Sequence, residues 1–109
     1  MEITQSQMGD YCVIRLCGNI DAAHTPKLKK FFKQTQNVPS PKVILDMAEV
    51  EFVDSTGLGA FISFFRNLKE NNGVFKLASL SDQVRTIFEI TRLYRVFEIY
   101  DSLEAALDS

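Results

Sequence analysis

A short run of hydroxyl, acidic and glycine residues stands out from the rest of the chain: Val53-Asp54-Ser55-Thr56-Gly57-Leu58-Gly59. It follows an apolar stretch and precedes an amphipathic one, so we expect it to lie at the start of a helix. The free N–H groups and the macrodipole of a helix N-terminus stabilise an anion. A hydroxyl at this position can carry a phosphate, which adds a charge of about −1.5 to −2. The run therefore predicts an exposed serine, Ser55, that gains or loses a phosphate.

Helix capping explains only part of this segment. The side chains of Asp54, Ser55 and Thr56 can each accept a hydrogen bond from a free N–H group of the first turn. Capping does not explain the glycines, because a Gly inside a helix is about 1 kcal/mol less favourable than Ala. Gly57 and Gly59 therefore indicate either tight packing of the turn or the close approach of another molecule.

The exposed side of the same helix is predicted to be nearly bare. Residues at spacings of three and four give the helix an apolar stripe for the core: Leu58, Phe61, Ile62, Phe65 and Leu68. Gly59, Ala60 and Ser63 are expected on the opposite side. A smooth surface of small residues beside a reactive hydroxyl favours the docking of a partner protein.

The residues support an enzymatic function less well than a binding function. A nucleophilic Ser needs a base within hydrogen-bond reach, and the only histidine, His24, lies on a predicted loop. The segment is neither a Gly-x-Ser-x-Gly elbow nor a phosphate-binding Walker loop. Four nearby carboxylates could bind a cation, although an acidic surface turn is the commoner explanation: Asp46, Glu49, Glu51 and Asp54. We expect no catalytic residue, no cofactor and no metal.

Bulk composition sets further bounds. At 109 residues and 46% hydrophobic content, the chain is expected to form one domain over residues 1–109. A net charge of −2 gives no support to nucleic-acid or anionic-membrane binding. The basic group Lys27, Lys29, Lys30 and Lys33 is interpreted as the solvated face of a helix.

No stretch of about 18 apolar residues exists, and Met1–Gln5 lacks the features of a signal peptide, so we expect a cytoplasmic protein without membrane insertion.

Alternating strand and helix signals predict an α/β fold. Strands are expected over residues 3–8, 11–17, 42–46, 74–78 and 96–100. Helices are expected between them, giving the order ββαβαβαβα. This order implies a mixed, mostly parallel sheet with an antiparallel hairpin at its N-terminal edge and helices packed on the sheet.

Local signals mark where these elements begin and end. Thr25 is expected to cap the first helix, with Pro26 at its first position. Gly73 is expected to end the second helix in a left-handed conformation, and Ser81 to cap the third. Asp101 is expected to cap the last helix. Before the hydroxyl segment, Val50 and Phe52 are expected to point inward.

The chain resembles the STAS domains, specifically the stand-alone bacterial anti-sigma factor antagonists. Its segment Asp54-Ser55-Thr56-Gly57-Leu58-Gly59 is similar to the family motif Asp-Ser-Ser/Thr/Ala-Gly-Leu-Gly. Gly18-Asn19-Ile20-Asp21 is similar to the family segment Gly-Glu/Asp-Leu/Ile-Asp, and Val43-Ile44-Leu45-Asp46 precedes the motif at the usual distance. The resemblance covers essentially the whole chain. Asn19 stands where an acid is commoner, which leaves the acidic patch one charge weaker.

The resemblance implies a partner switch. In such antagonists the Ser directly after the Asp, here Ser55, is phosphorylated by a serine kinase that is also the anti-sigma factor. The unphosphorylated form binds that kinase and frees the sigma factor, and a PP2C-type phosphatase resets the phosphorylated form. Asp21 and Asp54 are expected to flank the site, and the first half of the motif helix to contact the kinase. The expected contact residues are Asp21, Asp54, Ser55, Thr56, Gly57, Leu58, Gly59, Ala60 and Ser63.

Three functional hypotheses follow. The first is an anti-sigma factor antagonist switched by phosphorylation at Ser55, with Thr56 as the alternative phosphosite because some relatives use Thr. The second is a STAS subunit of another bacterial partner-switching or transport complex, which binds its partner without phosphoregulation and uses Ser55 only as a cap. The third is a small enzyme or nucleotide-binding protein.

Overall fold

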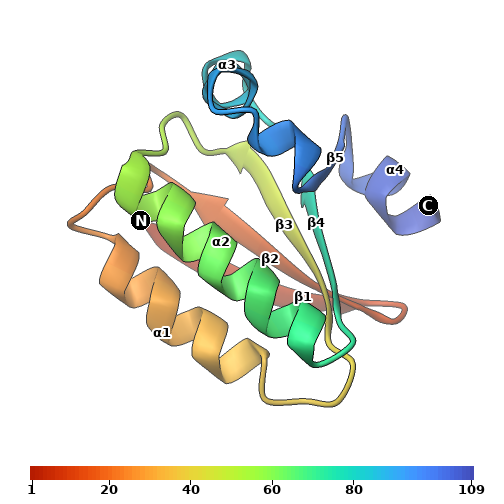
Figure 1. The fold of residues 1–109 in the computed structure, drawn as a ribbon. Coiled ribbons are helices and arrows are strands. Elements are labelled where there is room, and N and C mark those ends of the chain that lie inside the picture. The colour runs from red at the N-terminus through yellow and green to blue at the C-terminus, as the bar shows by residue number, and fades with distance from the viewer.

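Strands and helices alternate along the chain as the sequence predicts (Figure 1). The computed structural model describes residues 1–109. Its elements are β1 (Glu2–Met8), β2 (Tyr11–Cys17), α1 (Thr25–Thr35), β3 (Lys42–Glu49), α2 (Ser55–Glu70), β4 (Val74–Ala78), α3 (Asp82–Ile90), the short 3-10 helix η1 (Leu93–Arg95), β5 (Glu98–Tyr100) and α4 (Leu103–Asp108). No helix has the length and apolar character needed to cross a lipid bilayer.

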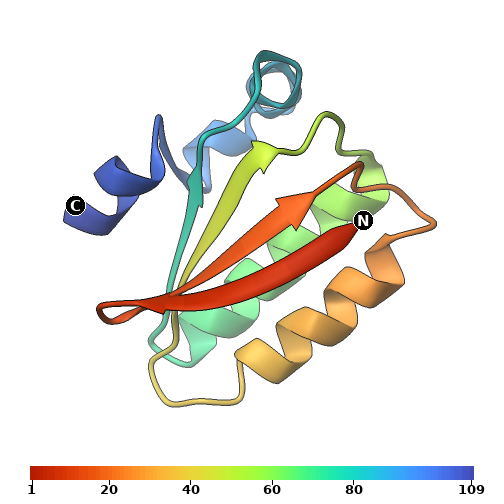
Figure 2. The same cartoon turned by 180° about the vertical axis from the view of Figure 1, so that it is seen from behind.

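The five strands form one sheet in the order β1-β2-β3-β4-β5 (Figure 2). β1 and β2 pair antiparallel through a tight turn, and each later strand is parallel to its neighbour. This arrangement confirms the predicted mixed, mostly parallel sheet with an N-terminal hairpin. Because parallel strands end at the same edge, the connections that follow β2 and β3 lie together there.

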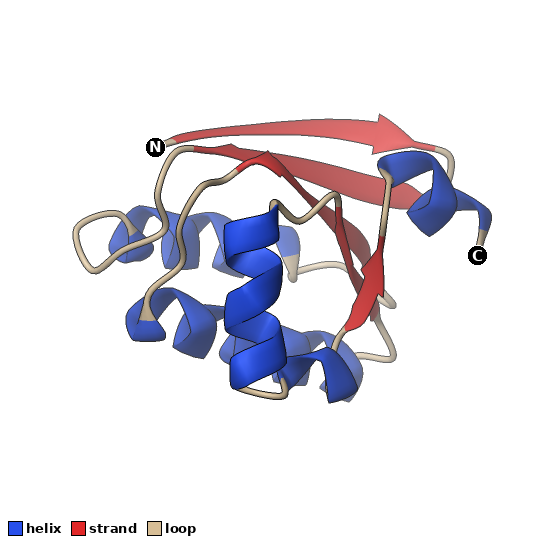
Figure 3. Ribbon diagram, turned by 90° about the horizontal axis from the view of Figure 1, so that it is seen from above, coloured by secondary structure: helices blue, strands red, loops and turns tan.

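Helices cover the sheet on both faces, with α1 and α2 on one side and α4 on the other (Figure 3). The central strand β3 is buried on both faces, as its nearly continuous apolar run predicts. Its residues Val43, Leu45 and Met47 join the main core beneath α1 and α2. Ile44 points to the other face, where Ala106 of α4 covers it.

Aromatic packing joins α1 to α2 and both to the sheet. The rings of Phe32 and Phe64 stack with centroids 4.0 Å apart, and Phe64 meets Phe75 of β4 edge-on at 5.2 Å. Phe64 is 1% exposed and lies outside the apolar stripe predicted for α2. The stripe is wider than predicted because α2 contacts both the sheet and α1.

Two helix boundaries differ from the predictions. Thr25 does not cap α1: it is the first helical residue, and its hydroxyl donates to the Asp21 carbonyl at 2.7 Å. At the end of α2, the left-handed residue is Asn72, with φ 59°, in place of Gly73. A Cβ at Gly73 would lie 2.5 Å from the Pro41 carbonyl oxygen, so close packing explains this glycine. The prediction that Ser81 caps α3 is confirmed.

Near β3 and α4, three further side-chain placements differ. Ser102, one residue after Asp101, caps α4. Val50 is buried as expected, but Phe52 is 47% exposed, so the prediction that it points inward is wrong. Asp46 is not on a surface turn either: it is buried and accepts two hydrogen bonds from the Arg15 guanidinium.

Candidate functional site

Two loops that are far apart in the sequence are joined beside the start of α2. The Ile20 N–H donates to the Phe52 carbonyl at 2.8 Å, and the Asp54 N–H donates to the Ile20 carbonyl at 3.0 Å. Ile20 also forms an isolated parallel bridge with Val53. These bonds extend the pairing of β2 and β3 beyond the ends of the strands. They therefore place the loop that contains Asp21 against the hydroxyl segment.

Asp54 is the residue that caps α2. Its Oδ1 accepts hydrogen bonds from the Gly57 N–H at 3.0 Å and from the Thr56 hydroxyl at 2.6 Å. Its Oδ2 accepts from the Ala22 N–H at 3.1 Å, across the two loops. The Thr56 hydroxyl and the Gly57 N–H favour the charged carboxylate and lower the pKa of Asp54. Asp54 thus joins the two loops and the helix start through one negative charge.

Asp21 lies in the neighbouring loop and has partners of its own. Its Oδ1 lies 2.7 Å from the His24 Nδ1 and accepts from the His24 N–H at 3.2 Å. Its carbonyl accepts from the Thr25 N–H and hydroxyl, which begins α1. Because the Ala22 N–H that follows Asp21 donates to Asp54, the structure brings these two predicted site acids into adjoining loops.

The two candidate hydroxyls have different surroundings. The Thr56 hydroxyl donates to the Asp54 carboxylate, and its oxygen lies 3.3 Å from the hydroxyl of the buried Thr25. Ser55 is exposed, and its hydroxyl makes no hydrogen bond within the chain. Thr56 is therefore part of the cap, whereas the hydroxyl of Ser55 has no structural role.

The two glycines of the motif have different reasons to be there. A Cβ at Gly57 would lie 2.7 Å from Ile20 Cγ2 and 2.9 Å from Val53 Cγ1, distances that packing does not allow. A Cβ at Gly59 would meet nothing within 4 Å. Packing within the chain therefore explains Gly57, whereas Gly59 leaves an open surface to which another molecule can approach closely.

The remaining predicted contact residues divide between the core and the surface. Leu58 is 9% exposed and belongs to the core cluster. Ala60 is 2% exposed, so the prediction that it lies on the bare outer side of α2 is wrong: α1 packs beside it. Ser63 is exposed, as is Gly59. The outer surface of the first two turns is narrower than predicted.

One exposed residue beside the motif was not among the predicted contacts. Phe52 immediately precedes Val53, and only one of these two neighbours can point into the core at this point of the chain. Val53 is buried and Phe52 is exposed. Val53 lies in an extended bridge with Ile20, where neighbouring side chains point to opposite sides, so burial of Val53 leaves Phe52 at the surface.

No hydrogen bond joins Ser55 to His24, whose Nδ1 pairs with Asp21. No group of three or more His, Cys, Asp or Glu side chains is arranged to hold a metal ion. What the site presents is a free hydroxyl, two acids in adjoining loops and an open glycine at the start of a long helix.

Comparisons with known proteins give the same family from sequence and from structure. The family model described as STAS domain matches residues 2–106. The anti-sigma-B factor antagonist of Listeria monocytogenes is 37% identical over 90 residues, which cover 83% of this chain and 79% of the relative.

Solved structures share the fold at lower sequence identity. An anti-sigma factor antagonist from Mycobacterium paratuberculosis superposes with a TM-score of 0.89 at 23% identity, covering 98% of this chain and 91% of that chain. SpoIIAA has been solved in an unphosphorylated form, which superposes with a TM-score of 0.81 at 23% identity and covers 98% of this chain and 94% of that one. The phosphorylated form of the Bacillus protein superposes with a TM-score of 0.73 at 22% identity, covering 98% of this chain and 97% of that one.

Proposed function

Because this chain belongs to the STAS-domain family, and within it to the anti-sigma factor antagonists, we propose that it is a protein-binding module switched by phosphorylation of Ser55. In its unphosphorylated form it binds an anti-sigma factor that is also a serine kinase, and the sigma factor is released. Phosphorylation of Ser55 ends this binding, and a PP2C-type phosphatase restores it. These partners act on the module in the cytoplasm.

The free hydroxyl of Ser55 is the observation that carries the proposal. Asp54 caps the helix, and the Thr56 hydroxyl donates a hydrogen bond to Asp54. The cap therefore does not require the Ser55 hydroxyl. This argues against the hypothesis that Ser55 serves only as a cap. An exposed hydroxyl without an internal partner can enter a kinase active site without breaking any bond of the fold.

The helix start can hold the phosphate that the reaction adds. The Ser55 oxygen attacks the γ-phosphorus of ATP in the kinase, the bond to ADP breaks, and the hydroxyl proton leaves to a base of the kinase. The dianion then sits at the N-terminus of a 16-residue helix, where the macrodipole favours it. It also lies next to Asp54, so it concentrates negative charge on the docking surface. The switch acts by charge and bulk, and the domain stays folded.

Mass spectrometry of the protein after incubation with ATP and the cognate kinase tests the phosphosite. We expect one phosphate on the wild type and on Thr56→Val, and none on Ser55→Ala. Circular dichroism of both variants checks that they remain folded. Phosphate on Thr56 would contradict the assignment to Ser55 and place the switch at the alternative phosphosite. Phosphate on no residue, with every candidate kinase of the same genome, would contradict the proposal and favour a STAS subunit that binds its partner without phosphoregulation.

Binding measurements test the switch itself. We expect Ser55→Asp to weaken kinase binding at least about tenfold, because a charge next to Asp54 disfavours the docked state. Its thermal unfolding should match that of the wild type. Equal affinities for the wild type and Ser55→Asp would count against a switch by charge.

A further inference from the structure

The two helices that cover one face of the sheet carry a charge opposite to that of the rest of the chain. α1 and α2 contain six of the twelve Lys and Arg residues but only one of the fourteen acidic residues, Glu70. The six cations are Lys27, Lys29, Lys30, Lys33, Arg66 and Lys69, and we call this surface the basic helix face. Since the whole chain has a net charge of −2, this face is a local positive surface on an otherwise acidic molecule.

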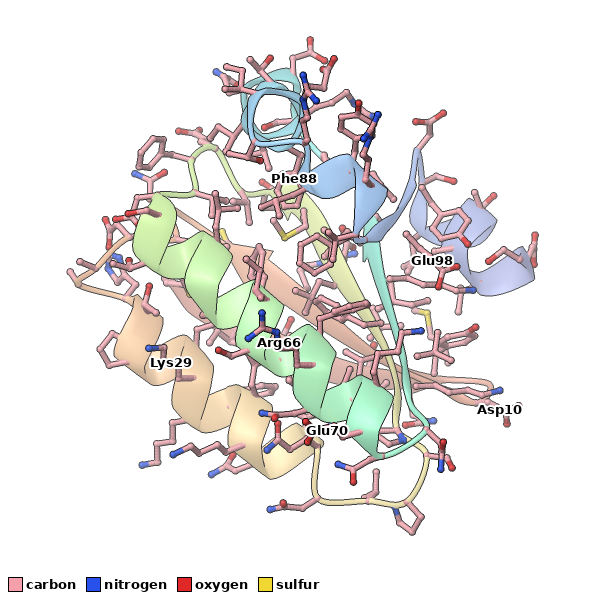
Figure 4. The ribbon with its side chains drawn as sticks, viewed as in Figure 1. Asp10, Lys29, Arg66, Glu70, Phe88 and Glu98 are labelled. Atoms are coloured by element: carbon pink, nitrogen blue, oxygen red, sulfur yellow. The ribbon has the colours of Figure 1, made fainter.

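The cations of the basic helix face are exposed and have no acidic partner. The ion pairs of the chain involve other basic residues: Arg15, His24, Lys42 and Arg85. Figure 4 shows Lys29 of α1 and Arg66 of α2 on the same side of the molecule. Unpaired positive charges on the two neighbouring helices give this surface a positive potential, which attracts an anionic partner.

A hollow of about 220 Å³ lies between the two helices on this face. Its floor contains the stacked rings of Phe32 and Phe64. The other residues around it are Lys29, Lys33, Gln36, Ala60, Ser63 and Asn67. The Asn67 amide donates to the Gln36 side chain at 3.3 Å, which bridges the helices. The hollow thus offers an apolar floor with cationic and hydrogen-bonding walls.

We propose that the basic helix face is a second docking surface, and that its partner is an acidic segment of the kinase that recognises Ser55. This inference rests on the proposed function and extends the contact beyond the phosphorylation motif. Ser63, at the hollow, lies eight residues after Ser55 on α2, a rise of about 12 Å at about 1.5 Å per residue. This separation is close to the Debye length of about 8–10 Å at physiological salt. The lysines therefore attract the acidic segment, and a phosphate on Ser55 repels it.

The surface is less suited to a membrane or to nucleic acid. A helix that lies on a membrane places large apolar side chains beside its lysines. The exposed large apolar residues of this chain all lie outside α1 and α2: Met8, Val38, Phe52, Ile90, Tyr94 and Val96. The aromatic rings of the two helices are buried or half-buried, so none is fully exposed for base stacking. The positive charge of the basic helix face, together with the polar walls of the hollow, favours binding of acidic protein side chains.

Paired charge reversals test the proposal. Lys29→Glu with Lys33→Glu changes the basic helix face, and Arg92→Glu with Arg95→Glu makes the same net change at exposed positions around η1. Association rate and Kd would be measured with the kinase of the same genome at low and high salt. We expect the lysine variant to associate about tenfold more slowly at low salt, with the difference lost at high salt. The arginine control should stay within about twofold of the wild type.

The outcomes separate this inference from the proposed function. If the kinase binds and phosphorylates all three proteins equally, the basic helix face is not a docking surface and the switch at Ser55 still stands. If the kinase does not bind the wild type, both the proposed function and this inference are contradicted. Binding of the wild type to phosphatidylserine vesicles or duplex DNA, lost in the lysine variant while its kinase affinity is unchanged, would also overturn it. Thermal unfolding of both variants excludes loss of fold as the cause.

Discussion

At the scale of single residues, the start of α2 separates side chains that build the fold from those left free for a partner. Asp54 accepts from Thr56, Gly57 and Ala22, and so ties the helix start to the neighbouring loop. Ser55 takes part in none of these bonds. A modification at Ser55 therefore changes the surface without removing a support of the structure.

The two glycines of the motif should respond oppositely to alanine. We expect Gly57→Ala to lower the free energy of unfolding by about 1–3 kcal/mol, because its Cβ overlaps Ile20 and Val53. Gly59→Ala should be neutral or stabilise by up to about 1 kcal/mol, because the Cβ meets open space and Ala favours a helix. Urea denaturation measures both. Equal losses in the free energy of unfolding at the two positions would contradict the conclusion that only Gly57 is required by packing within the chain.

Asp54 should make the stability depend on pH in the acidic range. Its pKa is lowered in the folded protein, so its stabilising effect is complete above its ordinary value of about 4 and is lost as the pH falls through the lower folded value. We expect Asp54→Asn to be less stable than the wild type at pH 7, and the gap to shrink below about pH 4. Urea titrations between pH 7 and pH 2 measure this gap, with the exposed Asp108→Asn as control. A stability difference between the wild type and Asp54→Asn that stays constant over this pH range would rule out stabilisation by the charged Asp54 carboxylate.

At the scale of elements, α4 depends on a buried lysine of the sheet. Lys76 is 3% exposed and donates to the Ala106 carbonyl at 2.8 Å, at the end of α4 where the helix dipole is negative. Its ammonium also lies 4.8 Å from the ring centre of Tyr11 and 5.2 Å from that of Tyr100. A helix of six residues has little stability alone, so these contacts hold α4 on the second face of the sheet.

Replacing this lysine should release α4. We expect Lys76→Met to lower the free energy of unfolding by about 1–3 kcal/mol, because the Ala106 carbonyl loses its charged donor. Hydrogen exchange of the α4 amides should accelerate more than that of α2. Lys30→Met, at an exposed position of α1, is the matched control and should change neither quantity. Unchanged protection of α4 in Lys76→Met would show that apolar contacts alone hold the helix.

At the scale of the whole molecule, aromatic rings connect the helical layer to the C-terminal part of the sheet. Phe75 of β4 meets Phe64 at 5.2 Å, Phe65 at 6.4 Å and Phe97 at 5.7 Å between ring centres. Phe97 in turn meets Phe88 of α3 at 5.9 Å. Segments from α2 to the last strand therefore share one core, and we expect them to unfold together.

Removing the central ring should weaken the entire fold. We expect Phe75→Ala to lower the free energy of unfolding by about 3–5 kcal/mol. This is a large part of the total free energy of unfolding of a typical domain, which is about 5–15 kcal/mol. Fluorescence and far-ultraviolet circular dichroism should report one coincident transition. Phe52→Ala, at an exposed position, should stay within about 0.5 kcal/mol of the wild type. Separate transitions for the two probes would contradict a shared core.

The order of elements and the position of the motif could be read from the sequence because both depend on local patterns. Alternation in β2, the apolar run of β3 and the three-and-four spacing in α2 are properties of neighbouring residues. Helix boundaries do not follow from such patterns alone, because either of two neighbouring residues can occupy the N-cap position: Thr25 or His24 in α1, and Asp101 or Ser102 in α4.

Contacts between distant parts of the chain determined what the site exposes. Gly57 is required by Ile20, which lies 37 residues earlier, whereas Gly59 meets no neighbour. Ala60 and Phe64 are buried because α1 packs beside α2, a second direction of contact that helical periodicity does not reveal. The motif and its helix are thus evident in the sequence. The Thr56 hydroxyl is held by Asp54, two residues away, and also lies near the hydroxyl of the distant Thr25. Which surface is open follows only from tertiary packing, because it depends on partners that the chain brings together on folding.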